Sequence, residues 1–302
     1  MHPRVSVIIP TFNRERTIRS SIDSVLRQTY SEFELIVVDD CSTDNTRSIL
    51  ATIDDPRIRL ICHDRNRGPS EARNTGTRAA SGEWLAFQDS DDEWLPTKLE
   101  LQMARLNGHT YVAVYCGVLI FGLWDPSAGG RPSAMYFPNP EMPLPDGDIL
   151  PMLLKDSFIS TQTLVVRRDV FEAEDLFDPS MPPLEDWDLA LRLARRGQIA
   201  FVDQPLVIQH FSPDSITRSR LKAVTAKSRI VEKNLDLLVS RPRVLSHHYH
   251  NIGGAWRDLR EYGKARQYLL KALRLSPLAP RSLLSLGYTL WLDFRQKIST
   301  TR

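Results

Sequence analysis

An acidic cluster is the feature of this 302-residue chain best suited to chemistry. Asp89, Asp91, Asp92 and Glu93 fall within five consecutive positions, directly after the apolar run 84–87. Carboxylates this close together repel one another unless a cation lies among them, and hard oxygen ligands suit Mg²⁺ or Mn²⁺. Such cations usually keep positions open for the phosphates of a substrate, so the cluster predicts a phosphate-bearing ligand. A solvated loop that caps a helix is the alternative, but capping needs one aspartate rather than three.

Alternating strands and helices precede this cluster and must position it. Apolar runs predict strands at residues 5–10, 33–38, 57–61 and 83–88. Helical periodicity and helix-start residues predict helices at 17–26, from residue 42 onward, and at 68–80. This alternation is typical of βαβ units around a parallel sheet. Ligands of such sheets bind at the carboxyl ends of the strands, which is where the acidic cluster falls.

Two other ligand-binding folds fit this pattern poorly. The turn after the first strand, residues 10–14, contains no glycine, so its backbone cannot approach a pyrophosphate as in a dinucleotide-binding Rossmann domain. The acidic pair Asp39 and Asp40 is similar to the pocket of a receiver domain. That pocket, however, follows the first strand, whereas this pair follows the second.

Four motifs carry a resemblance to a known family. They are VSVIIPTFN at residues 5–13, VVDDCSTD at 37–44, GPSEARN at 68–74 and GEWLAFQDSDD at 82–92. In order and spacing they resemble a family 2 glycosyltransferase, strongly over residues 4–100 and more weakly over 160–217. The resemblance implies a GT-A fold, which is a Rossmann-like mixed α/β sheet. It also implies a nucleoside-diphosphate sugar donor and a glycan or lipid-linked acceptor.

The resemblance assigns the donor to the ends of the first two strands. Pro10, Thr11 and Asn13 would line the pocket for the base and ribose. Asp40, which matches the family position better than Asp39, would accept a hydrogen bond from the base. A carboxylate acceptor suits the imide N–H of uracil, so a UDP-sugar is favoured. For Asp39, a turn residue that bonds its own backbone is an equal alternative.

The resemblance also implies roles for Arg73 and for the acidic cluster. Arg73 would face the nucleotide, because a guanidinium can bond phosphate in bidentate fashion or stack on a base. A surface arginine is the alternative. Asp91 would meet the donor ribose or sugar and share the metal site, Asp92 would bind Mn²⁺ or Mg²⁺, and Asp89 could do either. The metal would neutralise charge on the departing nucleoside diphosphate.

A second acidic motif, Glu185 and Asp186, matches the position of the catalytic base in the family. An inverting transfer needs one base opposite the leaving group to take the proton of the acceptor hydroxyl, and Asp186 would be that base. Glu185 would orient it or contact the acceptor, and Trp187 would pack or stack on a sugar. The alternative is a helix cap at a favourable dipole end.

The end of the family pattern is imperfect in this chain. Family members often carry a histidine three residues before a serine, whereas His210 lies two residues before Ser212. A role for His210 at the metal or diphosphate therefore stays open against that of a core or loop histidine.

Length and composition set the outer bounds. A chain of 302 residues that is 42% hydrophobic can bury one sizeable core and a smaller appendage. Its three cysteines show no metal-like spacing, which fits a reduced, cytoplasmic setting. The first strand begins almost at once and no apolar run reaches eighteen residues, so we expect neither a signal peptide nor a transmembrane helix.

The expected domain organisation is a catalytic domain followed by helices. The ranges are 1–217 for the catalytic domain, 1–107 and 108–217 for its nucleotide-binding and acceptor halves, and 218–302 for the α-helical region. The segment 123–148 is rich in proline and glycine, which predicts a long loop beside the acceptor side, and a strand is expected after it at residues 161–166. Residues 250–277 resemble one tetratricopeptide-type hairpin. A single such unit cannot bury its own face, so we expect it to pack as an appendage or to dock a protein.

Charge is distributed unevenly along the chain. Residues 218–302 contain 18 Lys or Arg and 5 Asp or Glu, which gives a net charge of +13. Residues 1–217 contain 21 Lys or Arg and 32 Asp or Glu, which gives a net charge of −11. Basic residues flank an apolar stripe of Leu221, Val224, Val231, Leu235 and Leu238. This combination predicts peripheral attachment to the anionic inner face of the cytoplasmic membrane. The alternative is packing on the acidic catalytic domain. Aromatic residues for base stacking are sparse, so no nucleic acid partner is expected.

The sequence therefore predicts a metal-dependent, inverting glycosyltransferase of cell-surface polysaccharide synthesis. A non-catalytic sugar-nucleotide-binding or scaffold protein, with a tail that recruits partners, is the alternative from another class. The acidic cluster together with Asp186 argues against it, because a binding protein needs no base.

Overall fold

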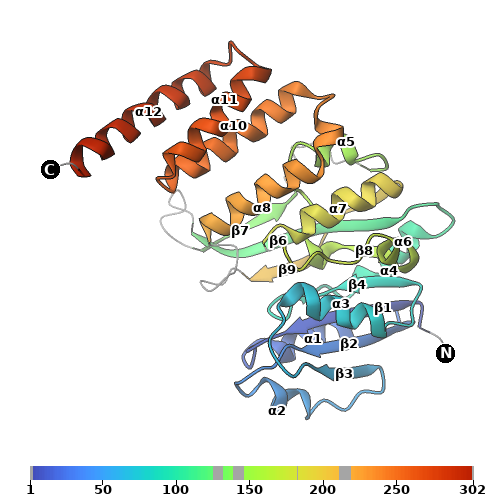
Figure 1. The fold of residues 1–302 in the computed structure, drawn as a ribbon. Coiled ribbons are helices and arrows are strands. Elements are labelled where there is room, and N and C mark those ends of the chain that lie inside the picture. Colours follow the sequence, from blue (N-terminus) through green and yellow to red (C-terminus); the bar gives the residue numbers. More distant parts are fainter. Residues whose placement is uncertain (1–2, 125–131, 139–145, 182, 211–218, 301–302) are drawn as a thin grey trace. The chain divides into compact units, whose positions relative to one another are not determined.

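The computed structural model describes residues 3–124, 132–138, 146–181, 183–210 and 219–300 (Figure 1). The chain divides into two compact units. The first comprises Met1–Ser180 and Glu185–Pro213, and contains the sheet. The second comprises Met181–Leu184 and Asp214–Arg302, and contains the C-terminal helices. The expected domain boundary at residue 217 lies outside the described residues.

The first seven elements of the catalytic unit alternate as predicted. They are β1 (Val5–Thr11), α1 (Ile18–Leu26), β2 (Phe33–Asp39), α2 (Thr46–Leu50), β3 (Ile58–Cys62), α3 (Pro69–Ala79) and β4 (Trp84–Phe87). The predicted strand ends differ from the observed ones by one residue. Strands β1, β2 and β4 are buried along almost their whole length, which matches their mainly apolar sequences. Strand β3 alternates more and is half-exposed.

The pairing of these strands explains where the site must lie. Strand β1 pairs in parallel with β2 on one side and with β4 on the other, and β2 pairs in parallel with β3. Thr11 lies opposite Asp39, and Ile8 lies opposite Phe87. The motifs that follow β1, β2 and β4 therefore meet at one edge of the sheet.

Helix α3 lies close against this part of the sheet (Figure 1). A β-carbon at Gly76 would fall 2.5 Å from Cγ2 of Ile8 in β1, a separation that real side chains do not reach. Glycine at this position therefore allows the helix to approach the strand. The close packing fixes α3, and with it the position of Arg73, relative to the strand ends.

The second half of the catalytic unit adds antiparallel strands. Its elements are β5 (Glu93–Trp94), α4 (Lys98–Leu106), β6 (Ala113–Trp124), β7 (Pro132–Phe137), α5 (Leu150–Leu153), η2 (Thr161–Thr163), β8 (Val165–Arg167), α6 (Arg168–Ala173), α7 (Glu185–Arg196) and β9 (Ile199–His210). The strand order is β3-β2-β1-β4-β8-β6-β9-β5, with β7 paired to β6. Strand β8 is antiparallel to both β4 and β6. The mixed sheet that the resemblance implied is therefore confirmed.

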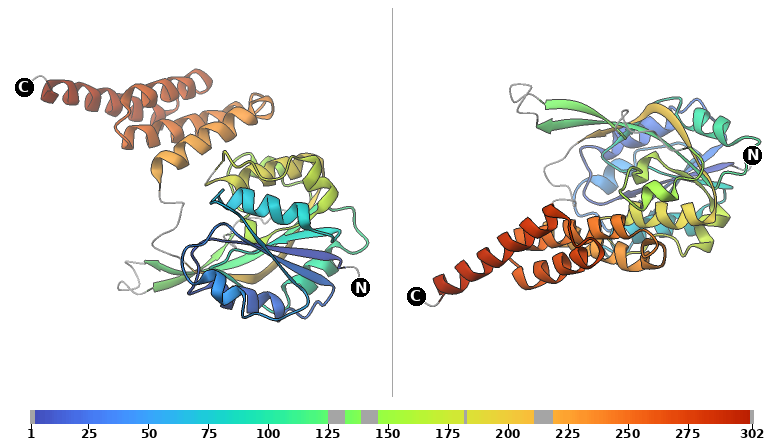
Figure 2. Two further views of the ribbon diagram at one scale, coloured as in Figure 1. Left: turned by 60° about the horizontal axis from the view of Figure 1, so that its bottom comes forward. Right: turned by 90° about the horizontal axis from the view of Figure 1, so that it is seen from above.

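Two local predictions differ from the structure. The expected strand at 161–166 begins as the 3₁₀ helix η2, and only Val165–Arg167 form β8. The expected loop at 123–148 is partly regular, because β7 pairs with β6 in a long antiparallel ribbon (Figure 2). Proline and glycine flank this ribbon and obscured its strand pattern; residues 125–131 and 139–145 lie outside the described part of the chain.

The second unit consists of helices. They are α8 (Arg220–Lys233), α9 (Leu235–Leu238), α10 (Pro242–Asp258), α11 (Tyr262–Leu275) and α12 (Pro280–Thr300). Helices α10 and α11 pack closely, because a β-carbon at Gly253 would fall 2.8 Å from Cγ of Leu269. This pair covers the segment expected to form a helical hairpin. None of the helices in the described ranges has the length and apolar character needed to span a membrane.

The apolar stripe expected to face lipid is largely covered. Val224, Val231 and Leu238 are buried, whereas Leu221 and Leu235 are exposed. Helix α8 packs on α10, so most of its apolar side chains serve protein packing. The sequence pattern alone could not tell a stripe that packs on another helix from one that faces lipid.

Candidate active site

A hydrogen-bonded turn presents the acidic cluster after β4. The backbone N–H of Asp92 donates to the carbonyl of Asp89 over 3.2 Å, and the Ser21 hydroxyl donates to the same carbonyl over 2.9 Å. The side-chain amide of Gln88 donates to the carbonyl of Asp92 over 2.7 Å. These bonds hold the backbone of the turn and leave its carboxylates available to other partners.

The carboxylates of this turn face too few positive charges. Asp92 is buried, and its Oδ1 accepts a hydrogen bond of 3.1 Å from the backbone N–H of His210. Burial and the charges of Asp89 and Asp91 raise the pKa of Asp92 well above its ordinary value. Burial and Asp89 also raise the pKa of Asp91, against the opposing effect of Arg14, whose Nη2 lies 3.3 Å from Asp91 Oδ2.

A divalent cation fits this donor set. Within the described ranges, no three His, Cys, Asp or Glu side chains form a ready-made metal site. Mg²⁺ in particular is usually held by only one or two carboxylates, with water and substrate phosphates as its remaining ligands. Asp91 and Asp92 match that requirement. Burial and, second to it, neighbouring negative charge raise their pKa values, and a bound cation would favour the charged carboxylates against both effects.

Arg73 in α3 connects the acidic turn to the second acidic motif. Its Nη2 lies 2.6 Å from Asp89 Oδ1, and its Nη1 lies 3.3 Å from Glu185 Oε1. Its guanidinium also lies 5.4 Å from the ring centre of Phe177. Arg73 is only 5% exposed, so the alternative of a surface arginine is wrong. Its expected contact with the nucleotide stays a prediction.

Asp186 lies in the first turn of α7, beside Glu185. Its Oδ1 accepts a hydrogen bond of 2.7 Å from the backbone N–H of Trp187. Burial and the charge of Glu185 raise the pKa of Asp186 to about 7, against the opposing effects of that N–H and of Arg73. Trp187 itself is buried and donates from Nε1 to the carbonyl of Leu153 over 2.8 Å. Its position favours the packing role over contact with a sugar.

The residues at the end of β1 and just after it lie at the same edge of the sheet. Pro10 and Thr11 are buried in β1. Asn13 adopts a φ of 52°, and its Oδ1 accepts a hydrogen bond of 2.8 Å from the backbone N–H of Thr43. The backbone N–H of Asn13 donates to the hydroxyl of Ser42 over 3.0 Å. Asn13 therefore holds the loop that follows β2 against the end of β1.

Asp39 and Asp40 occupy different environments at the end of β2. Asp39 is buried and accepts a hydrogen bond of 2.6 Å from Nε of Arg47. It also accepts one of 3.2 Å from the backbone N–H of Ser42, which is the kind of backbone bond that the turn alternative predicted.

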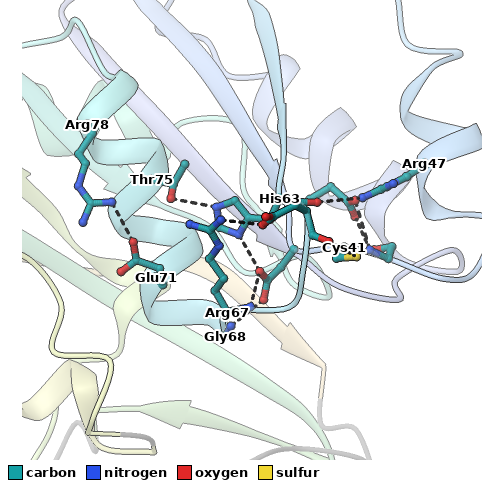
Figure 3. A network of polar contacts seen from close by, with 12 residues as sticks. Cys41, Arg47, His63, Arg67, Gly68, Glu71, Thr75 and Arg78 are labelled. Atoms are coloured by element: carbon teal, nitrogen blue, oxygen red, sulfur yellow. Dashed lines mark hydrogen bonds and ion pairs between the residues drawn. The ribbon is translucent and has the colours of Figure 1, made fainter.

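Figure 3 shows a polar network that includes His63, Arg67 and Gly68, and all three bond to Asp40. Its Oδ1 lies 2.7 Å from Nδ1 of His63 and accepts from the backbone N–H of Arg67 over 2.8 Å. Its Oδ2 accepts from the N–H of Gly68 over 2.7 Å. His63 in turn lies 2.9 Å from the hydroxyl of Thr75 in α3. Asp40 therefore fixes the loop that leads into α3, and its expected bond to the base stays a prediction.

Several site residues were missed by the sequence reasoning. Arg14 directly follows the first motif, but nothing in the sequence indicated that it would face Asp91. His63 lies outside all four motifs, and only its pairing with Asp40 in the folded chain reveals it.

Some of the buried polar atoms without a partner belong to residues near the acidic turn. Within the described chain they include Thr11 Oγ1, Arg14 Nε, Arg73 Nε, Gln88 Oε1 and Glu185 Oε2. Buried polar groups are normally hydrogen-bonded, so unpaired ones need an explanation such as a water or ligand. These five atoms could bond a polar ligand that binds beside the acidic turn.

Comparison with known proteins identifies relatives. Residues 6–173 match the family described as Glycosyl transferase family 2. The chain is 48% identical over 102 residues to the UDP-Glc:alpha-D-GlcNAc-diphosphoundecaprenol beta-1,3-glucosyltransferase WfgD of Escherichia coli, which covers 34% of this chain and 40% of that protein. It is 35% identical over 230 residues to the succinoglycan biosynthesis protein ExoO of Rhizobium meliloti, and this match covers 72% of this chain and 63% of ExoO. It is 30% identical over 224 residues to the putative teichuronic acid biosynthesis glycosyltransferase TuaG of Bacillus subtilis, and this match covers 73% of this chain and 84% of TuaG.

Solved structures share the fold. TarS 1-349 of S. aureus, in complex with UDP-GlcNAc, has a TM-score of 0.69 at 19% identity, and the match covers 96% of this chain and 88% of that one. The mannosyltransferase PcManGT from Pyrobaculum calidifontis, in complex with GDP-Man and Mn²⁺, has a TM-score of 0.60 at 21% identity, with coverage of 100% and 84%. At these identities the similarity shows the fold alone, and it confirms the predicted GT-A architecture.

Proposed function

The chain belongs to glycosyl transferase family 2, and from that premise we propose that it is an inverting glycosyltransferase of cell-surface polysaccharide synthesis. It would move a sugar from a nucleoside-diphosphate donor to a hydroxyl of a glycan or lipid-linked acceptor. The observation that carries this proposal is the pair of contacts from Arg73 to Asp89 and Glu185. They join the turn suited to a donor diphosphate to the helix start suited to a base.

The donor would bind at the ends of β1 and β2, with UDP-sugars favoured. Two observations support this assignment. Thr11 Oγ1 is buried and unpaired, which leaves it free for a ribose or base. WfgD is named for a UDP-Glc donor, and TarS binds UDP-GlcNAc. Asp39 and Asp40 would accept from the base or hold the loop around it.

A bound Mn²⁺ or Mg²⁺ would be held by Asp91 and Asp92. It would supply positive charge against the diphosphate of the leaving group. Arg14, beside Asp91, would add a second positive charge at the same place. Asp89 would hold Arg73 and thereby keep the guanidinium near the donor.

Asp186 would accept the proton of the acceptor hydroxyl. Its pKa of about 7 suits this role, because a base is most effective when its pKa lies near the working pH. Glu185 supports the role in two ways. Its charge raises the proton affinity of Asp186, and its contact with Arg73 fixes the start of α7. Glu185 Oε2 is buried and unpaired, which fits a contact with the acceptor.

The rival function is a non-catalytic sugar-nucleotide-binding or scaffold protein. A panel of nucleoside-diphosphate sugars with Mn²⁺ separates the two functions. The proposal predicts slow release of a nucleoside diphosphate from at least one donor. Binding of a donor without any release, with or without acceptor lipids, would favour the rival.

The inner face of the cytoplasmic membrane is the proposed place of action. The net charge of +13 on residues 218–302 suits an anionic leaflet. The name of WfgD describes a lipid-linked acceptor, an undecaprenol diphosphate, which supports an acceptor of this class for the present chain.

A further inference from the structure

Helix α12 carries most of its large apolar side chains on its exposed side, whereas Leu286 and Leu292 are half-buried. Leu284 is 75% exposed and Phe294 is 64% exposed. The other large exposed apolar residues of this helix are Leu283, Tyr288, Leu290, Trp291 and Ile298. The buried positions instead hold the small polar residues Ser282 and Thr289. An ordinary amphipathic helix places its wider apolar stripe against the core, whereas the wider apolar face of α12 is exposed.

Polar contacts within the helical unit fix this orientation. Ser282 Oγ lies 3.1 Å from Nδ1 of His250 in α10. Arg257 of α10 donates from Nη1 to the hydroxyl of Ser285 over 2.7 Å. The serine side of α12 is therefore bonded to α10, and the helix cannot turn its leucines and aromatic rings inward without breaking both contacts.

Basic residues border the apolar face. At the 3.6 residues per turn of an α-helix, the seven exposed apolar residues fall within an arc of about 160°. On the same geometry, Arg281 and Lys297 fall at its two borders, and Arg295 lies near one border with its guanidinium 4.8 Å from the ring centre of Trp291. Asp293 is the only acidic residue of the helix. Leucine and aromatic rings on one face, with arginine and lysine beside them, are typical of a helix that lies in a membrane interface.

We propose that α12 binds the surface of an anionic membrane, with Leu284, Trp291 and Phe294 inserted among the lipids and the basic residues against the headgroups. This inference rests on the proposed lipid-linked acceptor, because it would hold the enzyme where such an acceptor lies. A second copy of the chain is the less favourable occupant. A symmetric contact between two α12 helices would bring their basic borders together.

Flotation of the full chain with lipid vesicles tests the proposal. The vesicles contain phosphatidylcholine alone or phosphatidylcholine with phosphatidylglycerol, at several salt concentrations. We expect binding to the anionic vesicles that weakens as salt rises. The double variant Leu284→Gln/Phe294→Gln should lower the partition coefficient at least about tenfold, because it removes two inserted apolar side chains without changing charge. Arg281→Gln/Lys297→Gln should lower binding to anionic vesicles alone, by about fivefold per charge.

The matched control is Leu60→Gln, which replaces a leucine of β3 that is 43% exposed. It should float like the unmodified chain. The proposal is overturned if the unmodified chain does not float with anionic vesicles, or if Leu284→Gln/Phe294→Gln floats equally well. A dimer in light scattering that this double variant abolishes, in a chain that does not bind vesicles, would assign the face to a second copy. Release of nucleoside diphosphate, measured without lipid, tests the proposed function separately and should be the same in all variants.

Discussion

Arg73 Nη2 lies 2.6 Å from Asp89 Oδ1, and this partly buried ion pair connects helix α3 to the turn after β4. The other amino group of Arg73 reaches Glu185 at the start of α7. One guanidinium therefore links three segments that lie far apart in the sequence. Through these contacts, Arg73 holds in place both the turn proposed to bind the donor diphosphate and the start of the helix that carries the proposed base Asp186.

Removal of this arginine should damage both stability and activity. Arg73→Met leaves two carboxylates without their cation. Breaking a fully buried pair in this way lowers the free energy of unfolding by about 3–5 kcal/mol. The decrease should be smaller here, because Asp89 is partly exposed. Arg73→Lys keeps the charge but cannot reach both carboxylates, so it should fold better and still transfer slowly. Urea unfolding and donor turnover measure the two effects.

Arg78→Met is the matched control, because Arg78 lies on the same helix and pairs with Glu71 at the surface. It should change the free energy of unfolding by less than about 1 kcal/mol. If Arg73→Met and Arg78→Met lower the free energy of unfolding equally, the contacts of Arg73 with Asp89 and Glu185 do not stabilise the fold more than a surface ion pair does.

Asp186→Asn should separate binding from chemistry. The substitution preserves shape and removes the proton acceptor, so donor affinity should persist while transfer falls about 10²-fold or more. Equilibrium binding of the nucleotide and the rate of product formation test this. Asp188→Asn is a useful control on the same helix, because Asp188 is buried and pairs with Arg192 over 3.0 Å. It should lower stability and leave the turnover of folded protein nearly unchanged. A loss of donor affinity in Asp186→Asn would make Asp186 a donor contact instead.

The rate should depend on pH through the same aspartate. With a pKa of about 7, Asp186 is protonated in acid, so kcat/KM should fall about tenfold per pH unit below 7 and level off above it. Glu185→Gln removes a neighbouring negative charge and should move the midpoint to lower pH. A midpoint that Glu185→Gln does not move would contradict the assignment.

Stability should respond to pH in the opposite direction at this group. The raised pKa means that the folded chain binds this proton more tightly than the unfolded chain, whose aspartates titrate at about 3.9. The contribution of Asp186 to the free energy of unfolding should therefore decrease as pH rises from about 4 to 7. Denaturation of Asp186→Asn across this range should lack that contribution.

The metal prediction concerns Asp92. Asp92→Ala should abolish turnover that depends on Mn²⁺ and leave the fold intact, because it also relieves the repulsion from Asp89 and Asp91. Glu93→Gln, at the next position, should change turnover little. The measurement is nucleoside-diphosphate release against Mn²⁺ concentration, followed by addition of a chelator. Full activity of Asp92→Ala, or of the unmodified chain in chelator, would contradict the proposed metal dependence.

The sequence predicted the first four strands because their signal is local. Runs such as that of β1 are mainly apolar, and their order alone placed the acidic turn at the carboxyl edge of the sheet. The antiparallel strand β8 was harder, since only Val165–Arg167 pair with β4 and the residues before them form a 3₁₀ turn. Whether such a short segment forms a strand depends on its pairing with strands that are distant in the sequence.

The partners of the site residues could not be predicted from motifs. Arg73 and Asp40 were both singled out, but their contacts with Glu185 and His63 arise from segments that meet only in the folded chain. The same holds for the helical region. Periodicity identified apolar residues on α8 and missed α12, because only packing decides which of two apolar stripes is covered.

Transfer of labelled sugar to membrane lipids tests the central claim most directly. Membrane lipid extract, Mn²⁺ and a set of labelled UDP-sugars are incubated with the unmodified chain and with Asp186→Asn, and label is counted in the lipid fraction. The account predicts that one donor labels lipid with the unmodified chain, and that Asp186→Asn binds that donor equally well but transfers at about one hundredth of the rate or less. Equal labelling by both proteins, or donor binding without transfer from any nucleotide sugar, would contradict it.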